Sequence, residues 1–132
     1  MTLISDMAAS LVSQGLATAL GTDIFGFRFP SSPLNCICII PAGGREPDLY
    51  DSTGAIDRPG LQIQVRNTDV LVAEASAEAI RTGLDLATIS GYVICRTTRS
   101  RPVDVTSPDD LKADDGPAYR FSVDFILSEV RT

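Results

Sequence analysis

The chain has 132 residues, of which 44% are hydrophobic and 21% are charged, and its net charge is −6. This length suits one domain with its own core, and this composition excludes a fibrous protein or wholesale disorder. Ten Arg and a single Lys, Lys112, carry the positive charge, which excludes a lysine-rich patch that grips nucleic acid.

The first twenty residues predict an amphipathic helix. Its apolar stripe comprises Ile4, Met7, Ala8, Leu11, Gly15 and Ala19, with Asp6, Ser10 and Ser13 on the far side. No Lys or Arg precedes Arg28, and polar residues interrupt the apolar ones. The segment therefore resembles neither a signal peptide nor a membrane span, and we expect a protein made and kept in the cytoplasm, without a membrane partner.

Two strands are predicted next. Residues 23–30 (DIFGFRFP) are rich in aromatic and β-branched side chains and end at Pro30. Residues 34–40 (LNCICII) are apolar except for Asn35, which predicts a strand that is covered on both faces near the middle of a sheet. Residues 41–59 are rich in Gly, Pro, Asp and Ser without a sustained period, which predicts a long loop.

The hydrophobic period changes within residues 59–86. Leu61, Ile63 and Val65 alternate with polar residues, which predicts a half-buried strand. Asp69 and the two residues before it can cap a helix, which we expect to reach Leu86. The arc predicted to face the core comprises Val72, Ala73, Ala75, Ser76, Ala77, Ala79, Ile80, Gly83, Leu84 and Leu86, with Glu74, Glu78, Arg81 and Asp85 opposite.

The remaining sequence predicts two strands separated by a second loop. Residues 92–98 (YVICRTT) and the alternating residues 119–127 predict strands, and residues 99–118 predict a solvated loop. We therefore expect an α/β protein of the α+β type, with a single mixed sheet of about five strands and two main helices packed on it. Residues 1–132 are expected to form one domain with long loops at about 41–59 and 99–118.

The sequence predicts no catalytic residue, cofactor or metal ion, and not an enzyme. Three cysteines without any His give at most a three-ligand thiolate site, and we favour reduced, buried Cys36, Cys38 and Cys95 over that alternative. Gly43 and Gly44 precede Arg45 without a Lys, which favours a plain turn over a phosphate cradle. The acidic run near residue 110 lacks EF-hand spacing, which favours a solvated loop over a cation site.

Residues 58–69 (RPGLQIQVRNTD), the helix after them and the closing strand resemble the minor capsid or tail terminator proteins of tailed bacteriophages. The matching positions are Pro59, Leu61, Gln62, Ile63, Val65, Arg66, Asp69, Ala79, Ile80 and Leu84. The resemblance implies a structural protein of the virion tail or neck that assembles in the host cytoplasm. It further implies a ring, expected to be hexameric, that ends the tail tube and joins it to the head. Its implied partners are other copies of itself, the tail tube protein and head-completion or neck proteins, with DNA passing through without specific binding.

We expect the two loops to contribute the contacts between subunits or with the tail tube. The candidate interface residues are Arg45, Glu46, Asp48, Tyr50, Arg58, Arg99, Arg101, Asp109 and Asp110. Their mixed charges can make complementary contacts between identical subunits placed head to tail. The alternative is a small cytoplasmic ligand-binding or regulatory domain whose loops close a pocket, with an enzyme as the third choice. Oligomeric state distinguishes the first two, because only the terminator must form a ring.

Overall fold

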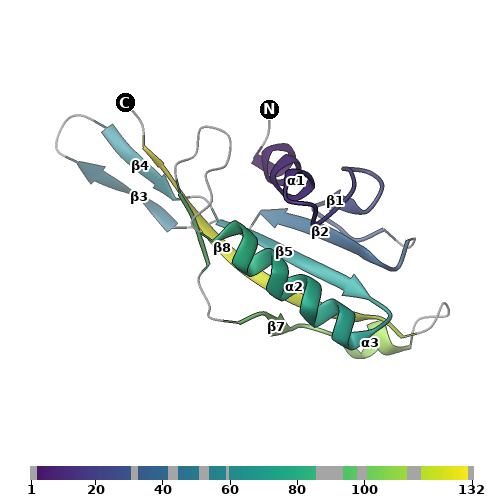
Figure 1. The fold of residues 1–132 in the computed structure, drawn as a ribbon. Helices are drawn as coiled ribbons and strands as arrows, with labels where there is room; N and C mark the ends of the chain where they lie inside the picture. The colour runs from purple at the N-terminus through teal and green to yellow at the C-terminus, as the bar shows by residue number, and fades with distance from the viewer. Residues whose placement is uncertain are drawn as a thin grey trace.

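A computed structural model describes most of the chain and assigns three helices and eight strands to the residues that it describes (Figure 1). The described residues are 3–30, 33–41, 45–50, 54–58, 60–85, 94–97, 101–112 and 117–130. The elements in chain order are α1 (Leu3–Ser13), β1 (Ile24–Gly26), β2 (Cys36–Pro41), β3 (Arg45–Tyr50), β4 (Gly54–Arg58), β5 (Gly60–Asn67), α2 (Val70–Leu84), β6 (Ile94–Thr97), β7 (Val103–Asp104), α3 (Pro108–Leu111) and β8 (Tyr119–Val130).

The strands form one mixed sheet with β8 at its centre. The order runs β1-β2-β5-β8, where β1 and β2 are parallel and the other pairs are antiparallel. Both β5 and β7 pair with Phe121 and Ser122 of β8, so they lie on opposite sides of that strand. Strand β6 also pairs with β8. The predicted α+β class, with two main helices on a mixed sheet, is confirmed, and the five predicted strands correspond to β1, β2, β5, β6 and β8.

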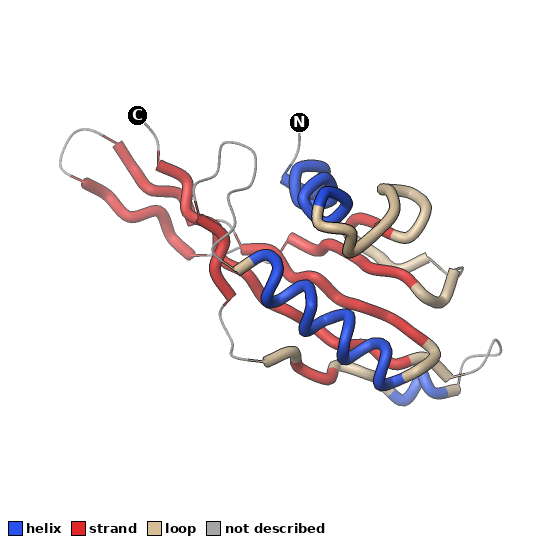
Figure 2. The backbone as a smooth tube through the Cα atoms, in the orientation of Figure 1, coloured by secondary structure: helices blue, strands red, loops and turns tan. Residues whose placement is uncertain are grey.

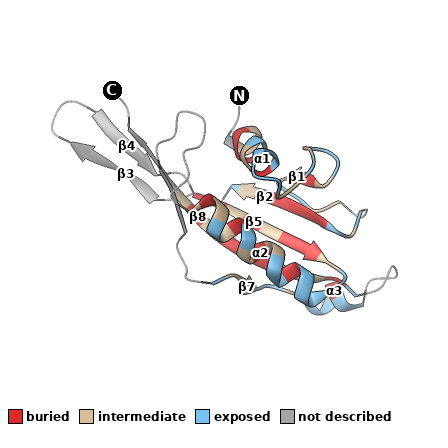
Figure 3. Ribbon diagram, viewed as in Figure 1, coloured by how far each residue is buried: buried red, intermediate tan, exposed pale blue. Residues whose placement is uncertain are grey.

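Helices α1 and α2 pack on the same face of the sheet and enclose the core. Figure 3 shows the buried side of α2 turned toward the sheet and its outer side exposed. The buried cluster draws Met7, Ala8 and Leu11 from α1, Ala73, Ala77, Ile80 and Leu84 from α2, and Ile24, Ile37, Ile39, Leu61, Ile63, Val65, Phe121, Val123 and Phe125 from the strands. The apolar residues that alternate along β5 and β8 therefore do face the helices, as their period of two predicts.

Helix α2 begins and ends close to the predicted residues, but its buried face is narrower than expected. The Asp69 side chain caps the helix by accepting hydrogen bonds from the backbone N–H groups of Leu71 and Val72. Only every third or fourth residue is buried, and Val72, Ala75 and Ala79 are exposed. The prediction that these three face the sheet is wrong. Alanine fits both faces of a helix and does not mark its orientation, and Val72 lies beside the buried stripe, not within it. In α1, Asp6 is buried although its position predicted exposure.

The predicted loop at residues 41–59 is wrong for much of its length. Strands β3 and β4 pair with each other there, and β4 continues the pairing onto the end of β8 at Glu129 and Val130. Figure 2 shows this hairpin extending beyond the part of the sheet that the helices cover. Residues 99–118 likewise contain β7 and α3. These elements are short. The strands are ordered by backbone pairing, of β3 with β4 and of β4 and β7 with β8, which the side-chain pattern does not reveal.

The opposite face of the sheet is polar at its centre. Gln64 and Gln62 of β5 lie beside Ser122 and Asp124 of β8, respectively. Gln64 Nε2 donates to Gln62 Oε1 over 2.8 Å, and Gln62 Nε2 donates to Asp124 Oδ1 over 3.0 Å. The side-chain amides of Gln62 and Gln64, which alternate with core residues along β5, therefore have hydrogen-bond partners on this face.

Candidate assembly surfaces

Arg66 of β5 binds the segment that follows β1 through side-chain hydrogen bonds. Its side chain is only 6% exposed, and its Nε donates to the carbonyl oxygen of Leu34 over 2.9 Å. Its Nη2 donates to the carbonyl oxygens of Pro30 and Pro33. The Phe29 ring also lies 4.7 Å from the guanidinium carbon of Arg66. The carbonyl groups of Pro30, Pro33 and Leu34 lie outside the strands, and all three accept hydrogen bonds from the guanidinium of Arg66.

The segment that Arg66 holds in place follows an unusual turn at Phe27. The backbone N–H of Arg28 donates to the carbonyl oxygen of Gly26 over 2.8 Å, which closes a three-residue turn around Phe27. Phe27 has φ of 69°, a left-handed value that residues with a side chain rarely adopt. Such γ-turns with positive φ are rare and strained. The strained residue is also 65% exposed, so packing of its ring within the protomer does not account for the strain.

Phe27 belongs to a group of exposed apolar side chains at the β1 edge of the sheet. The group comprises Val12, Leu20 and Phe27, which we call the β1-edge surface. Val12 and Leu20 border a cavity of about 420 Å³ between α1 and residues 18–20, whose lining is mostly apolar. Asp23 holds this region in place by accepting hydrogen bonds from the backbone N–H groups of Thr18 and Ala19.

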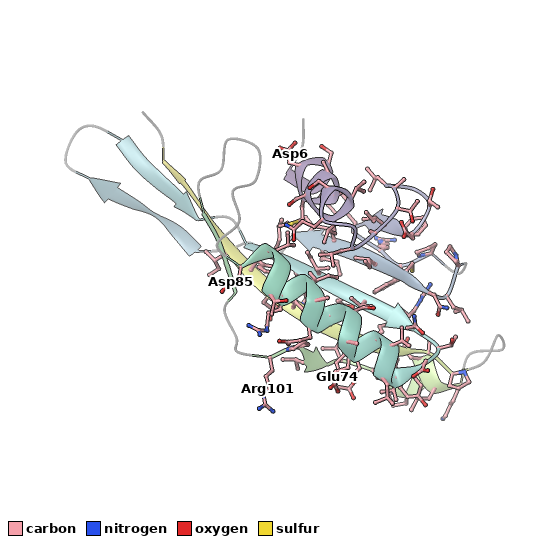
Figure 4. The ribbon with its side chains drawn as sticks, in the orientation of Figure 1. Asp6, Glu74, Asp85 and Arg101 are labelled. Atoms are coloured by element: carbon pink, nitrogen blue, oxygen red, sulfur yellow. The ribbon has the colours of Figure 1, made fainter. Side chains whose placement is uncertain are left out.

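A groove lies at the opposite edge of the sheet, between α2 and the segment that leads into β7. This α2–β7 groove has a volume of about 670 Å³ and is lined by Leu71, Glu74, Ala75, Glu78, Arg81, Arg101, Pro102 and Phe121. Leu71 is 73% exposed at one end of it. Figure 4 shows Glu74 and Arg101 projecting from α2 and from the segment before β7, on the same side of the sheet.

Charges in the groove are only partly paired. Glu78 forms an ion pair with Arg81, and this hydrogen bond lowers the pKa of the Glu78 carboxyl, with the charge of Arg101 acting in the same direction. Glu74, by contrast, makes no ion pair or hydrogen bond with any residue in the described ranges. Because Glu74 is exposed, its charge is available to a partner.

The structure distributes the predicted interface residues over several elements. Arg101 is exposed and lines the groove. Asp110 is instead buried, where it pairs with Arg120 over 2.8 Å and accepts hydrogen bonds from Ser107, so its charge is satisfied within the protomer. The backbone of β3 and β4 carries Arg45, Glu46, Asp48, Tyr50 and Arg58, and α3 carries Asp109, but their side chains lie outside the described part. Arg99 falls wholly outside the described residues.

The surface residues that the sequence interpretation missed are Phe27, Leu71 and Glu74. The aromatic residues around Phe27 predict only a strand, and the pattern around Leu71 and Glu74 predicts only an amphipathic helix. The positive φ of Phe27 leaves no sequence signal, because glycine or asparagine would be the usual residue at such a position.

The described cysteines behave as small buried apolar residues. Cys36 and Cys38 are free thiols in β2, and burial raises the pKa of Cys38 to about 11. Burial also raises the pKa of Cys36, although the nearby Arg66 opposes that change. Within the described ranges, no three His, Cys, Asp or Glu side chains are grouped so that they could hold a metal ion. The side chain of Cys95 lies outside these ranges.

No helix among the described residues combines the length and the apolar character that crossing a membrane requires.

Comparisons with known proteins show a match to one family model and matches to several chains of solved structures. Residues 11–130 match the family model described as "Bacteriophage tail terminator protein". The comparison with curated proteins gives no match. Among solved structures, the chain resembles one from "Virion of native gene transfer agent (GTA) particle", with 19% sequence identity and a TM-score of 0.53. That alignment covers 92% of this chain and 82% of the other, which shows a shared fold.

Proposed function

Because this chain belongs to the bacteriophage tail terminator family, we propose that copies of it form a ring, expected to be hexameric, that ends the tail tube and joins it to the head. The family match runs from the last residues of α1 to the end of β8, so it includes both edges of the sheet. The protein is thus a structural component of the virion tail. No catalytic group is assigned to it, since a terminator acts by occupying the end of a tube.

The observation that best supports a ring is the distribution of exposed apolar side chains. Among the described residues, large exposed apolar side chains occur toward both edges: Val12, Leu20 and Phe27 near β1, and Leu71, Val105 and Leu111 near β7. Val70 and Val72 are also exposed, at the start of α2. These edges lie on opposite sides of the sheet. Two different patches on opposite sides favour head-to-tail association, which closes into a ring when the rotation between subunits allows it.

The β3–β4 hairpin supplies a further candidate contact with a neighbouring subunit, with the tail tube protein or with a neck protein. Its backbone carries Arg45, Glu46, Asp48, Tyr50 and Arg58 away from the helix-covered body (Figure 1). Opposite charges at these positions can pair across a subunit boundary, and such exposed pairs weaken as salt screens them. Arg99, Arg101 and Asp109 remain candidates for the same kind of contact, whereas Asp110 does not, because it is paired internally.

DNA passing through the ring would meet an acidic protein. The net charge of −6 and the single Lys provide little attraction for phosphates, so the ring should allow DNA to move without holding it.

Light scattering and electron microscopy of purified tails test this proposal together. We expect association that increases with protein concentration and decreases with salt, and a ring at one end of tails to which the protein is added. Tails without the protein, and tails mixed with an unrelated acidic protein of similar size, serve as controls. A protein that neither self-associates nor binds a tail end would refute the ring and favour the small ligand-binding domain instead.

A further inference from the structure

We infer that Phe27 of one copy inserts into the α2–β7 groove of the next copy around the ring. This inference rests on the proposed function, because it requires neighbouring copies in head-to-tail contact. It assigns the partner of both surfaces to a second copy of this chain. It also explains why the two surfaces occur on the same protomer, at opposite edges of its sheet.

The conformation of Phe27 indicates that its side chain has a partner outside the protomer. A side chain that is 65% exposed gains little within the protomer, yet the chain keeps it at φ of 69° in a strained turn. Strain of this kind persists where the surrounding structure holds it, and it concentrates at functional sites. Arg66 supplies that support by binding the carbonyl groups of the following segment. Aromatic residues fixed in this way are frequent anchors of protein interfaces.

The groove is large enough for such an anchor, and part of its lining is apolar. Its volume of about 670 Å³ lies within the range of pockets that bury a whole small ligand, so an aromatic ring and its neighbours can enter. Leu71, Ala75 and Phe121 give it apolar contacts, and Leu71 is the most exposed large apolar side chain among the described residues. Insertion of Phe27 would remove the exposed side chains of Phe27 and Leu71 from water.

Charge complementarity favours a second copy as the occupant. Arg28 follows Phe27 directly, is exposed, and makes no side-chain ion pair or hydrogen bond with any residue in the described ranges. Glu74 lies in the groove in the same unpaired condition. When Phe27 enters the groove, Arg28 is carried to its border, where Glu74 can receive it. A surface carboxylate and a guanidinium then pair across the boundary between copies.

A double cysteine variant tests the contact directly. In Phe27→Cys/Leu71→Cys, each copy presents one thiol at each edge, so mild oxidation of the assembled protein should link neighbours in series. Non-reducing electrophoresis should then show a ladder of multiples of the chain that ends at the ring number. The matched control is Phe27→Cys/Ala79→Cys, because Ala79 is exposed on the same helix but does not line the groove. The wild-type chain, with its native cysteines, gives the background.

Phe27→Gly separates assembly from folding. Glycine adopts positive φ without strain, so this variant should melt at or above the temperature of the wild type. It should nevertheless associate about thirtyfold more weakly, the loss typical of a removed interface anchor of about 2 kcal/mol at 1.4 kcal/mol per tenfold. Glu74→Arg should also weaken association, and Arg28→Glu in the same chain should restore part of it.

The outcomes distinguish the two proposals. If the wild type forms rings while the double variant gives no ladder beyond the control and Phe27→Gly assembles normally, this inference fails and the ring remains. If the wild type neither self-associates nor binds tail ends, both fail. A ladder for Phe27→Cys/Leu71→Cys, with weakened but folded Phe27→Gly, supports both.

Discussion

Replacing Arg66 by Ala should destabilise the fold more than its place on a predicted alternating strand suggests. The change removes a buried cation and leaves the carbonyl groups of Pro30, Pro33 and Leu34 without their donor. Each hydrogen bond to a charged group contributes about 1.5–3 kcal/mol, and the contributions within one network are not additive. The expected loss is therefore about 3–5 kcal/mol of unfolding free energy, which corresponds to a melting temperature lower by about 12–20 °C.

Thermal unfolding followed by circular dichroism measures this loss, with Arg28→Ala as the control. Arg28 is exposed, so its removal should change the unfolding free energy by less than about 0.5 kcal/mol. Arg66→Lys should fall between the two, because one ammonium cannot reproduce the geometry of the guanidinium donors. Amide exchange should also increase after β1 in Arg66→Ala. We expect the unfolding free energies of Arg66→Ala and Arg28→Ala to differ by about 3 kcal/mol or more. A difference below about 1 kcal/mol would show that Arg66 does not hold the segment after β1 in place.

Three further predictions concern α2 and β2. Ala77→Glu places a charge against the sheet and should lower the unfolding free energy by several kcal/mol. Ala79→Glu, on the exposed side, should lower it by less than about 0.5 kcal/mol. Equal melting temperatures of the two variants would mean that α2 is rotated relative to the orientation described above. Asp69→Ala removes the N-cap and should lower the unfolding free energy by about 1 kcal/mol in urea titrations, and no change would show that the cap is dispensable. Burial raises the pKa of Cys38 from 9.0 to about 11. Above pH 9 the unfolded chain therefore loses a proton that the folded chain retains, so stability should fall as pH rises toward 11. Urea titrations should show a shallower fall in Cys38→Ala, and identical slopes would contradict a buried neutral thiol.

The sequence predicted those elements whose side chains alternate between core and solvent with a clear period. Strands β5 and β8 have a period of two, and α2 begins at a residue whose side chain caps it. These signals are local, so they can be read without knowing what packs where. The family resemblance rested on the same stretch of chain, and the family match confirms it.

The elements that the sequence did not predict depend on partners distant along the chain. Strands β3 and β4 contain Pro, Gly and Asp, which disfavour strands locally. Their backbone is nevertheless ordered, because β3 pairs with β4 and β4 also pairs with the distant β8. The burial of Arg66 depends on carbonyl groups more than thirty residues away. The candidate surfaces were missed for the same reason: they form where α2 approaches the segment before β7, and where β1 turns at Phe27.

The central place of β8 also determines when this protein can fold. Strand β8 pairs with β4, β5, β6 and β7, although it is the last strand along the chain. Until β8 has been made, β5 has an unpaired edge and the apolar faces of α2 and β5 lack Phe121, Val123 and Phe125. Because these pairings join residues far apart in the sequence, the chain should fold slowly for its size and only once β8 has been made. Chains that still lack β8 would then be unable to join an assembly, so that each subunit enters it only as a finished fold.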